Sequence, residues 1–445
     1  MKMNQDVINE KLPMGKNLAY ALQHVFVMVA GAVAVPLMIG ATADLSSNEI
    51  SFLISCALLV SGIATLLQCL GITKLVGSRL PIVEGPSFAP ASAMAAIIGG
   101  VMSQAGGKGV DGLRELSAAV ICAGIFCIIL SGVWGKILFL FPKVVTGCVV
   151  TIIGMSLYPV GIRWVLNGNT EAQPKDILLA ALTLLIILLC NKFLKGVLGN
   201  LSVLFGLIGG TIIGFIMDPS IFSPVAQAKW FEIAKPFNAG APIFKAGSII
   251  SIILTMIVIM TAATGNMIAI STAAGEEIDP KTLGAGLRAS GISTVFSGIF
   301  NCYPVAPFAQ NVGMVSLTQV FSRFVTASAG VILVLLGLFP KFAAIFTAIP
   351  SPVLGGAGFA MFGIVAVDGI RTLGQVNYIG NRNGVIVAVS LGLSFISTVN
   401  GGFFNAFPAN VATILNSGIT IGSASAILLN VFFNIFLAPK ENEKK

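Results

Sequence analysis

The polar residues that could do chemistry in this sequence are few. The stretch 306–314, which reads APFAQNVGM, holds the amide pair Gln310 and Asn311 inside a mostly apolar chain. A primary amide offers hydrogen-bond donors and an acceptor together, so this pair suits recognition of a flat polar molecule by its edge. The chain has a single histidine, His24, and no acidic cluster in its apolar runs. No catalytic constellation or metal-ligand spacing is visible, so we do not expect an enzyme.

Composition sets the surroundings of these residues. Of the 445 residues, 56% are hydrophobic and 9% are charged, whereas soluble domains have about 25% charged residues. The lipid bilayer is therefore the expected solvent. The net charge of +8 fits Lys and Arg gathered in cytoplasmic loops and gives no reason to expect nucleic acid as a partner. The seven cysteines lie in apolar runs and are expected to act as small hydrophobic residues.

Apolar runs long enough to span a bilayer recur along the whole chain. Eleven lie near 18–40, 50–71, 113–134, 138–160, 176–193, 201–217, 246–272, 322–339, 350–367, 383–399 and 416–437. Three more, 80–100, 283–300 and 302–318, are interrupted or marginal. The sequence thus predicts an all-α polytopic membrane protein with 14 transmembrane segments. If both termini are cytoplasmic, 17 of the Lys and Arg residues lie on that side and 8 on the other, as the positive-inside rule favours.

Two long segments indicate an internal repeat. The stretches 141–163 and 349–371 match at six positions when offset by 208 residues. They belong to segments five and twelve, and an odd separation of seven segments reverses the topology. Inverted repeats of this kind are typical of secondary transporters.

Segments three and ten also correspond to each other, and both are broken by proline. One contains Phe88-Ala89 followed by Met94, and the other contains Phe308-Ala309 followed by Met314. Prolines remove helix hydrogen bonds, and the freed backbone groups must face protein or water because lipid cannot satisfy them. We expect short strands near 81–88 and 303–308 to pair with each other. Half-helices would then begin near Ala89 and Ala309, with their N–H groups directed at the membrane centre.

The alternative is that both segments are ordinary helices kinked by proline and glycine, which are common. Two such segments in equivalent places, one with an amide pair, favour a binding site.

The stretch 310–318 reads Q-N-x-G-x-x-x-x-T, with Gly313 and Thr318 at its last two fixed positions. This pattern resembles the signature of the nucleobase–ascorbate transporters, also called nucleobase:cation symporter family 2. Leu22-Gln23-His24, Val35-Pro36, Leu80-Pro81 and Gly286-x-Arg288 are also similar to the family. The resemblance covers essentially the whole chain, and the Q-N form is similar to the bacterial xanthine and urate permease branch.

The resemblance implies a fold and a mechanism. It implies 7+7 inverted repeats, homodimers, and an elevator-like exchange of access across the cytoplasmic membrane. A mobile core domain would comprise 17–134 (segments 1–4) and 245–340 (segments 8–11). A gate domain would comprise 135–217 (segments 5–7) and 341–438 (segments 12–14). The implied cargo is a nucleobase, with xanthine or urate favoured.

The resemblance also implies roles for individual residues. Gln310 would hydrogen-bond the edge of the base, Phe88 would stack on its ring, and the N–H groups near Ala309 would contribute. Asn311 would support this geometry, with Gly313 and Thr318 as further support. These roles agree with the chemistry of a purine, which has a polar edge and an aromatic face.

The sequence departs from the family where acids are expected. Ala262 and Ser290 stand where the family has a glutamate in segment eight and an aspartate in segment nine. Glu84 is the prominent remaining ionisable group at membrane depth, and such groups are functional hypotheses by default. Glu84 either replaces the missing carboxylate, as ligand partner or proton carrier, or is structural, bonded to nearby backbone or near the interface. For His24, helix packing and a role in the site are equally open.

Without those acids, Thr264 and Asn266 could line the site, since Asn266 lies one turn beyond Ala262 on the same helix face. No cofactor is expected, and the coupling ion, a proton or sodium, stays open. Two alternatives to coupled transport also stay open, an uncoupled facilitator and an anion transporter or channel-like protein of the same 7+7 fold. No phosphate-binding loop is present to suggest that ATP drives transport.

Overall fold

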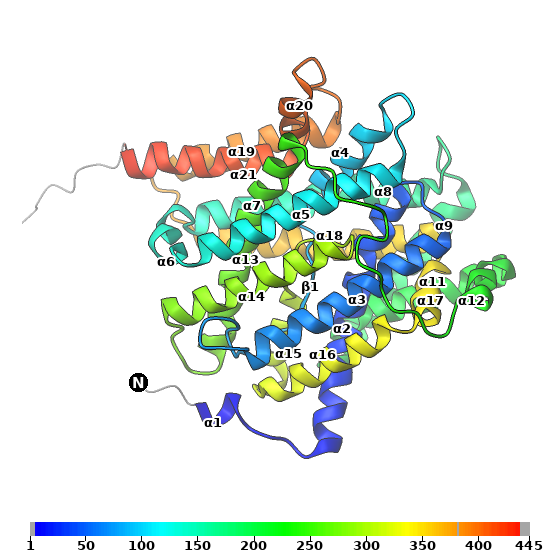
Figure 1. The fold of residues 1–445 in the computed structure, drawn as a ribbon, viewed down its shortest axis with the longest axis horizontal. Coiled ribbons are helices and arrows are strands. Elements are labelled where there is room, and N and C mark those ends of the chain that lie inside the picture. The colour runs from blue at the N-terminus through cyan, green and yellow to red at the C-terminus, as the bar shows by residue number, and fades with distance from the viewer. Residues whose placement is uncertain (1–4, 381, 437–445) are drawn as a thin grey trace, which may run out of the picture.

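The computed structural model describes residues 5–380 and 382–436, and these residues are mostly helical (Figure 1). The predicted gate domain ends at 438, so its last two residues lie outside the described part. The first half contains α1 (Gln5–Ile8), α2 (Met14–Thr42), α3 (Ser47–Leu70), β1 (Glu84–Pro86), α4 (Ala91–Met102), α5 (Gly109–Ser131), α6 (Trp134–Ile137), η1 (Leu138–Leu140), α7 (Lys143–Ser156), α8 (Tyr158–Leu166), α9 (Pro174–Phe193), α10 (Val197–Asn200), α11 (Ser202–Met217), η2 (Pro219–Phe222) and α12 (Ser223–Gln227). The second half contains α13 (Ala246–Ala273), α14 (Pro280–Ile299), β2 (Val305–Pro307), α15 (Ala309–Thr318), α16 (Arg323–Gly337), α17 (Pro340–Thr347), α18 (Ser351–Leu373), α19 (Arg382–Val399), α20 (Ala409–Leu415), α21 (Gly418–Asn430) and η3 (Val431–Phe436).

Many of these helices are long and apolar enough to cross a membrane. Within the described residues there are nine of them, or up to eleven if each of two sharply bent helix pairs is one span. The bent pairs are α11 with η2–α12, and α16 with α17. The three runs predicted to be interrupted or marginal coincide with β1–α4, with α14 and with β2–α15. These features make the protein a multi-pass membrane protein.

The two short strands pair with each other near the middle of the molecule, where Figure 1 shows β1 enclosed by helices. The pairing is antiparallel, with Glu84 opposite Pro307 and Gly85 opposite Ala306. The predicted pairing of the broken segments is therefore confirmed. The half-helix α15 begins at Ala309, as predicted, while α4 begins at Ala91 because Pro90 occupies its N-cap.

Close helix pairs surround the strands, and glycine makes them possible. Helix α3 packs along α16, and α5 packs along α14. A Cβ atom at Gly62 of α3 would lie 2.5 Å from the carbonyl oxygen of Gly330 of α16. In the second pair, a Cβ atom at Gly124 of α5 would lie 2.8 Å from the carbonyl oxygen of Gly291 of α14. Only glycine allows backbones to approach this closely, as is common between membrane helices.

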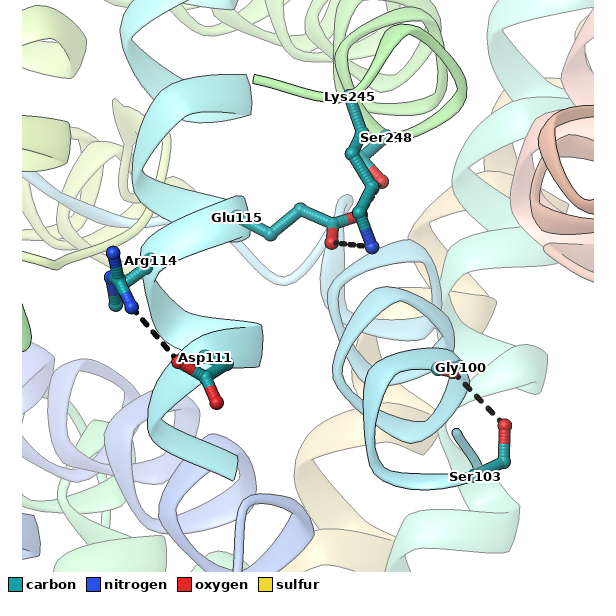
Figure 2. A network of polar contacts seen from close by, with 7 residues as sticks. All are labelled: Gly100, Ser103, Asp111, Arg114, Glu115, Lys245 and Ser248. Atoms are coloured by element: carbon teal, nitrogen blue, oxygen red, sulfur yellow. Dashed lines mark hydrogen bonds and ion pairs between the residues drawn. The ribbon is translucent and has the colours of Figure 1, made fainter. Parts of the chain in front are cut away.

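Other helices pack in pairs away from the strands: α7 with α18, α9 with α11, and α19 with α21. A polar network fixes a further contact, between α5 and the start of α13 (Figure 2). There the buried carboxylate of Glu115 pairs with Lys245, with Nζ 2.7 Å from Oε2, and accepts a hydrogen bond from Ser248. Arg114, beside it, pairs with Asp111 and donates to the carbonyl of Ala241.

Candidate functional site

The backbone of the site is built by the paired strands and held by two threonines. The amide of Phe308 donates to the carbonyl of Val83 at 2.9 Å, which extends the pairing toward α15. Thr65 of α3 accepts a hydrogen bond from the amide of Glu84 at 3.0 Å. Thr294 of α14 accepts one from the amide of Val305 at 3.1 Å. Each strand is thus fixed by a hydroxyl from a neighbouring helix, and this satisfies backbone donors that lipid could not satisfy.

Gln310 lies in the first turn of α15 with its side chain exposed. Among the described residues, its amide group makes no hydrogen bond, so both its donors and its acceptor are available to a ligand. The first turn of a helix also leaves backbone N–H groups without intrahelical acceptors, and Ala309 and Gln310 occupy that position here. The positive end of the helix dipole lies at the same place, which favours an acceptor-rich or anionic ligand.

Phe88 follows β1 and precedes α4, and its side chain is half-buried. Its ring meets the ring of Phe362 of α18 edge to face, with centroids 5.8 Å apart. Phe362 in turn stacks on Trp164 of α8 at 6.1 Å. The aromatic side of the site therefore draws on α8 and α18, which belong to neither broken segment.

Two amide side chains hold the polar side of the site in place. Asn311 is buried, and its Nδ2 lies 3.0 Å from Nδ1 of His24 and 3.0 Å from the carbonyl oxygen of His24 on α2. Asn266 of α13 donates to the carbonyl of Pro307 at 3.2 Å, at the end of β2. Both residues thus contact the backbone or side chains that position Ala309 and Gln310.

The other predicted residues lie in different surroundings. The hydroxyl of Thr264 accepts a hydrogen bond from the indole of Trp134 at 2.9 Å and donates to its own helix, so it ties α13 to α6. Gly313 is exposed on α15, and a Cβ atom there would meet nothing within 4 Å. Thr318, at the end of α15, donates to the carbonyl of Met314 at 2.9 Å.

Glu84 is fully buried, and its Oε1 accepts a hydrogen bond of 2.8 Å from the hydroxyl of Ser290 on α14. The structure therefore joins two residues that the sequence singled out separately and that are 206 positions apart. Among the described residues, no group of three or more His, Cys, Asp or Glu side chains could hold a metal ion.

Sequence reasoning missed Phe362 and Trp164 as parts of the site. Phe362 lies within the repeat stretch 349–371, whereas Trp164 lies one residue beyond its counterpart 141–163, so the repeat does not mark both residues. Aromatic side chains in apolar helices are usually packing residues, so the sequence alone gave no reason to single them out.

The arrangement has the properties of a binding site for a flat polar molecule. The segment after β2 provides an unpaired amide and a helix N-terminus, and the segment after β1 provides an aromatic ring. A polar edge would be recognised by the amide and the N–H groups, and a ring face by Phe88.

Comparison with known proteins places the chain in a family. Residues 15–402 match the model of xanthine and uric acid permeases, described as a permease family. The chain is 41% identical to the uric acid transporter UacT of Escherichia coli strain K12, across 96% of this chain and 88% of that protein. It is 39% identical to the uric acid permease PucJ of Bacillus subtilis strain 168 (94% and 93% covered) and 38% identical to the xanthine permease of the same strain (97% and 97%).

Solved structures share the fold at low sequence identity. The transmembrane domain of the cyanobacterial bicarbonate transporter BicA superposes with a TM-score of 0.63 at 16% identity, covering 94% of this chain and all of that chain. Murine Slc26a9, an anion transporter in the inward-facing state, superposes with a TM-score of 0.61 at 12% identity, covering 96% of this chain and 69% of that chain. At such identities the likeness concerns the fold alone. The family is shown by sequence, through the match of residues 15–402 to the permease family and the identity to the uric acid and xanthine permeases. The chain belongs to the nucleobase–ascorbate transporter family, and it is a membrane permease and not an enzyme.

Proposed function

We propose that this protein is a secondary transporter that carries a purine base, xanthine or urate, across the cytoplasmic membrane. The observation that carries the proposal is the antiparallel pair of β1 and β2, which brings the first turns of α4 and α15 to the middle of the molecule. The ring of Phe88 follows β1 along the chain, and the free amide of Gln310 follows β2. The names of the uric acid and xanthine permeases among the relatives support the class of base.

In the proposed complex, Gln310 and the N–H groups near Ala309 bind the polar edge of the base, and Phe88 stacks on its face. Asn311 and Asn266 hold the start of α15 by the hydrogen bonds described above. A site that hydrogen-bonds a polar edge discriminates strongly against analogues that leave its groups unpaired. Gly313 and Thr318 support α15, and Thr264 supports α13 through Trp134.

A 7+7 inverted repeat with 14 segments is part of the proposal, and the helix pairs support it. An inverted repeat relates each segment to the one seven places later. Segment two (α3) then corresponds to segment nine (α14), and segment four (α5) corresponds to segment eleven (α16), so the pair α3–α16 is related to the pair α14–α5. Both pairs pack closely through glycine. It also relates the pair α9–α11 to the pair α19–α21, and these two pairs pack as well.

We further propose an elevator-like movement of a core domain (17–134 and 245–340) against a gate domain (135–217 and 341–438). The strands, α15 and the helices that hold them all belong to the proposed core. The gate contributes Phe362, which touches Phe88 by its ring edge. A movement of the core would therefore carry nearly the whole site with it. Both termini on the cytoplasmic side and a homodimer complete the proposal, with no cofactor.

An anion transporter or an uncoupled facilitator of the same fold is the second candidate. The likeness to a bicarbonate transporter and to Slc26a9 is compatible with it but extends only to the fold. An anion transporter would have little need for the free amide of Gln310.

The test is a thermal-shift panel on the purified protein with purines, pyrimidines, ascorbate, bicarbonate and chloride. We expect urate or xanthine to raise the melting temperature, and Gln310→Ala to weaken that ligand's binding about 10- to 100-fold, because hydrogen-bond partners on the base are left unpaired. Gln375→Ala, which removes an exposed amide in the loop after α18, is the matched control and should bind normally. Stabilisation by bicarbonate or chloride, with no response to any base, would overturn the proposal.

A further inference from the structure

The carboxyl group of Glu84 is the buried ionisable group closest to the strand pair that forms the proposed site. Glu84 is the first residue of β1, lies opposite Pro307, and is 0% exposed. Its Oε1 accepts a hydrogen bond from Ser290. Its Oε2 is buried and has no hydrogen-bond partner among the described residues. A carboxyl group with a purely structural role would be expected to have both oxygens satisfied, because buried polar atoms are almost always paired.

No described cation compensates a charge on Glu84. From α3, the titratable group nearby is the thiol of Cys69, which is bonded to the carbonyl of Ile82. From α5, it is the thiol of Cys127, which is bonded to the carbonyl of Leu287. Two further titratable or charged residues on the surrounding helices have other partners. On α2, His24 is engaged by Asn311, and on α14, Arg288 is exposed and donates to the carbonyl of Leu75.

An unpaired carboxylate in such surroundings costs far more free energy than the neutral acid does. The hydroxyl of Ser290 suits both states, because it can donate to Oε1 both in the carboxylate and in a neutral acid protonated on Oε2. A proton bound on Oε2 would give that oxygen the O–H group of a neutral acid.

A cavity with several charged residues in its wall lies beside α14. The cavity has a volume of about 350 Å³ and is lined by Ser78, Leu80, Thr282 and Ala285 among others. Charged side chains, Lys74, Arg79, Asp279 and Arg323, also line it, so it suits water. A Cβ atom at Gly286 would lie 3.1 Å from Cβ of Ser78, and Ser290 lies one helical turn after Gly286. The wall of the cavity is thus one turn of α14 away from the partner of Glu84.

We propose that Glu84 is the residue that binds and releases the proton coupled to transport, with Ser290 as its hydrogen-bond partner in both states. The inference rests on the proposed function. A hydronium ion gives its proton to Oε2, so that one of its O–H bonds breaks, a new O–H bond forms on Oε2 and a water molecule is left, and the carboxyl group passes from a charge of −1 to neutral. Neutral Glu84 removes a negative charge from beside the site, which allows an anionic base such as urate to bind. It also removes the penalty of moving a buried charge with the core domain.

The test uses the full chain in proteoliposomes with labelled urate and xanthine and an imposed inward proton gradient. In the wild type, we expect the gradient to raise accumulation, and added urate or xanthine to acidify a lumen loaded with a pH indicator. In Glu84→Gln, gradient-driven accumulation should fall at least tenfold and the acidification should disappear, while some uptake without a gradient persists. In Glu84→Gln/Ser290→Asp, which moves the carboxylate across the same hydrogen bond, both responses should return in part.

Glu115→Gln is the matched control, since Glu115 is another buried glutamate but lies away from the strands. It should keep the full response to the gradient. If Glu84→Gln does not fold, Ser290→Ala replaces it, and the pH dependence of its uptake should shift because the carboxyl group loses its partner. Retention of the wild-type gradient response by Glu84→Gln, or of the wild-type pH profile by Ser290→Ala, would overturn the inference. Wild-type protein that takes up no base at all would instead contradict the proposed function.

Discussion

The amide nitrogen of Asn311 lies 3.0 Å from both Nδ1 and the carbonyl oxygen of His24, so one side chain on α15 is held by two acceptors of a single residue on α2. Both residues are buried. The amide donates both of its hydrogens, which requires Nδ1 of His24 to be unprotonated and the ring proton to be on Nε2. This contact holds the first turn of α15, where the free amide of Gln310 lies.

The losses of stability caused by the two single substitutions of this pair are expected to add up to more than the loss caused by the double substitution. His24→Phe leaves a buried donor of Asn311 unpaired, and Asn311→Leu leaves Nδ1 of His24 unpaired, each at a cost of about 1–3 kcal/mol. Replacing both partners removes the unpaired groups together. Thermal unfolding in detergent should therefore show that the loss in the double variant His24→Phe/Asn311→Leu is smaller than the sum of the two single losses. Additive losses would mean that the contact contributes little.

The ring of Phe308 has almost no free space around β1, and this predicts the effect of a single methyl group. A Cβ atom at Gly85 would lie 2.5 Å from Cε2 of Phe308. Gly85→Ala should therefore displace Phe308, destabilise the protein by about 1–3 kcal/mol and weaken base binding, since Phe308 directly precedes Ala309. Phe308→Leu should restore part of the loss when combined with Gly85→Ala. Thermal unfolding and urate titration measure both effects.

Gly99 of α4 provides the control for this series, because a Cβ atom there would meet nothing within 4 Å. Gly99→Ala should bind urate as the wild type does. If Gly85→Ala were equally harmless, the ring of Phe308 would not be fixed as the structure indicates.

The ion pair between Glu115 and Lys245 (Figure 2) joins a buried carboxylate to a half-exposed amine. Lys245→Ala leaves the carboxylate buried with Ser248 as its remaining partner, so we expect a loss of about 1–3 kcal/mol. Glu115→Gln/Lys245→Ala should lose less, because no buried charge remains. The matched control is Lys229→Ala, which breaks the exposed pair with Glu232 and should change stability by less than about 1 kcal/mol. Equal melting temperatures for Lys245→Ala and Lys229→Ala would contradict the prediction.

The broken segments could be predicted because their cause is local. Prolines such as Pro81 and Pro307 remove helix donors wherever the chain places them, so strands near 81–88 and 303–308 followed from the sequence. The start of α15 at Ala309 followed for the same reason. Asn311 was expected to support the site, and its buried contact with His24 is consistent with that expectation.

The partners of these residues could not be predicted, because they are set by tertiary packing. Nothing local indicates that the hydroxyl of Thr264 lies beside Trp134, 130 positions away, or that Ser290 lies beside Glu84. The substitution of Ser290 for an acid was visible in the sequence. That its hydroxyl bonds the one buried carboxyl group of the strand pair became visible only in the fold.

The contact between Phe362 of the proposed gate domain and Phe88 of the proposed core domain is expected to affect the affinity for the base. Its ring meets Phe88 edge to face and stacks on Trp164, and such aromatic contacts contribute about 0.5–1.5 kcal/mol. Phe362→Leu should therefore release Phe88 and raise the urate concentration for half-maximal uptake about 2- to 10-fold. Phe359→Leu, on the same helix but stacked on Tyr158, should leave that concentration unchanged. If the two variants behaved alike, the contact between Phe88 and Phe362 would not position the ring for the base, and the core alone would determine affinity.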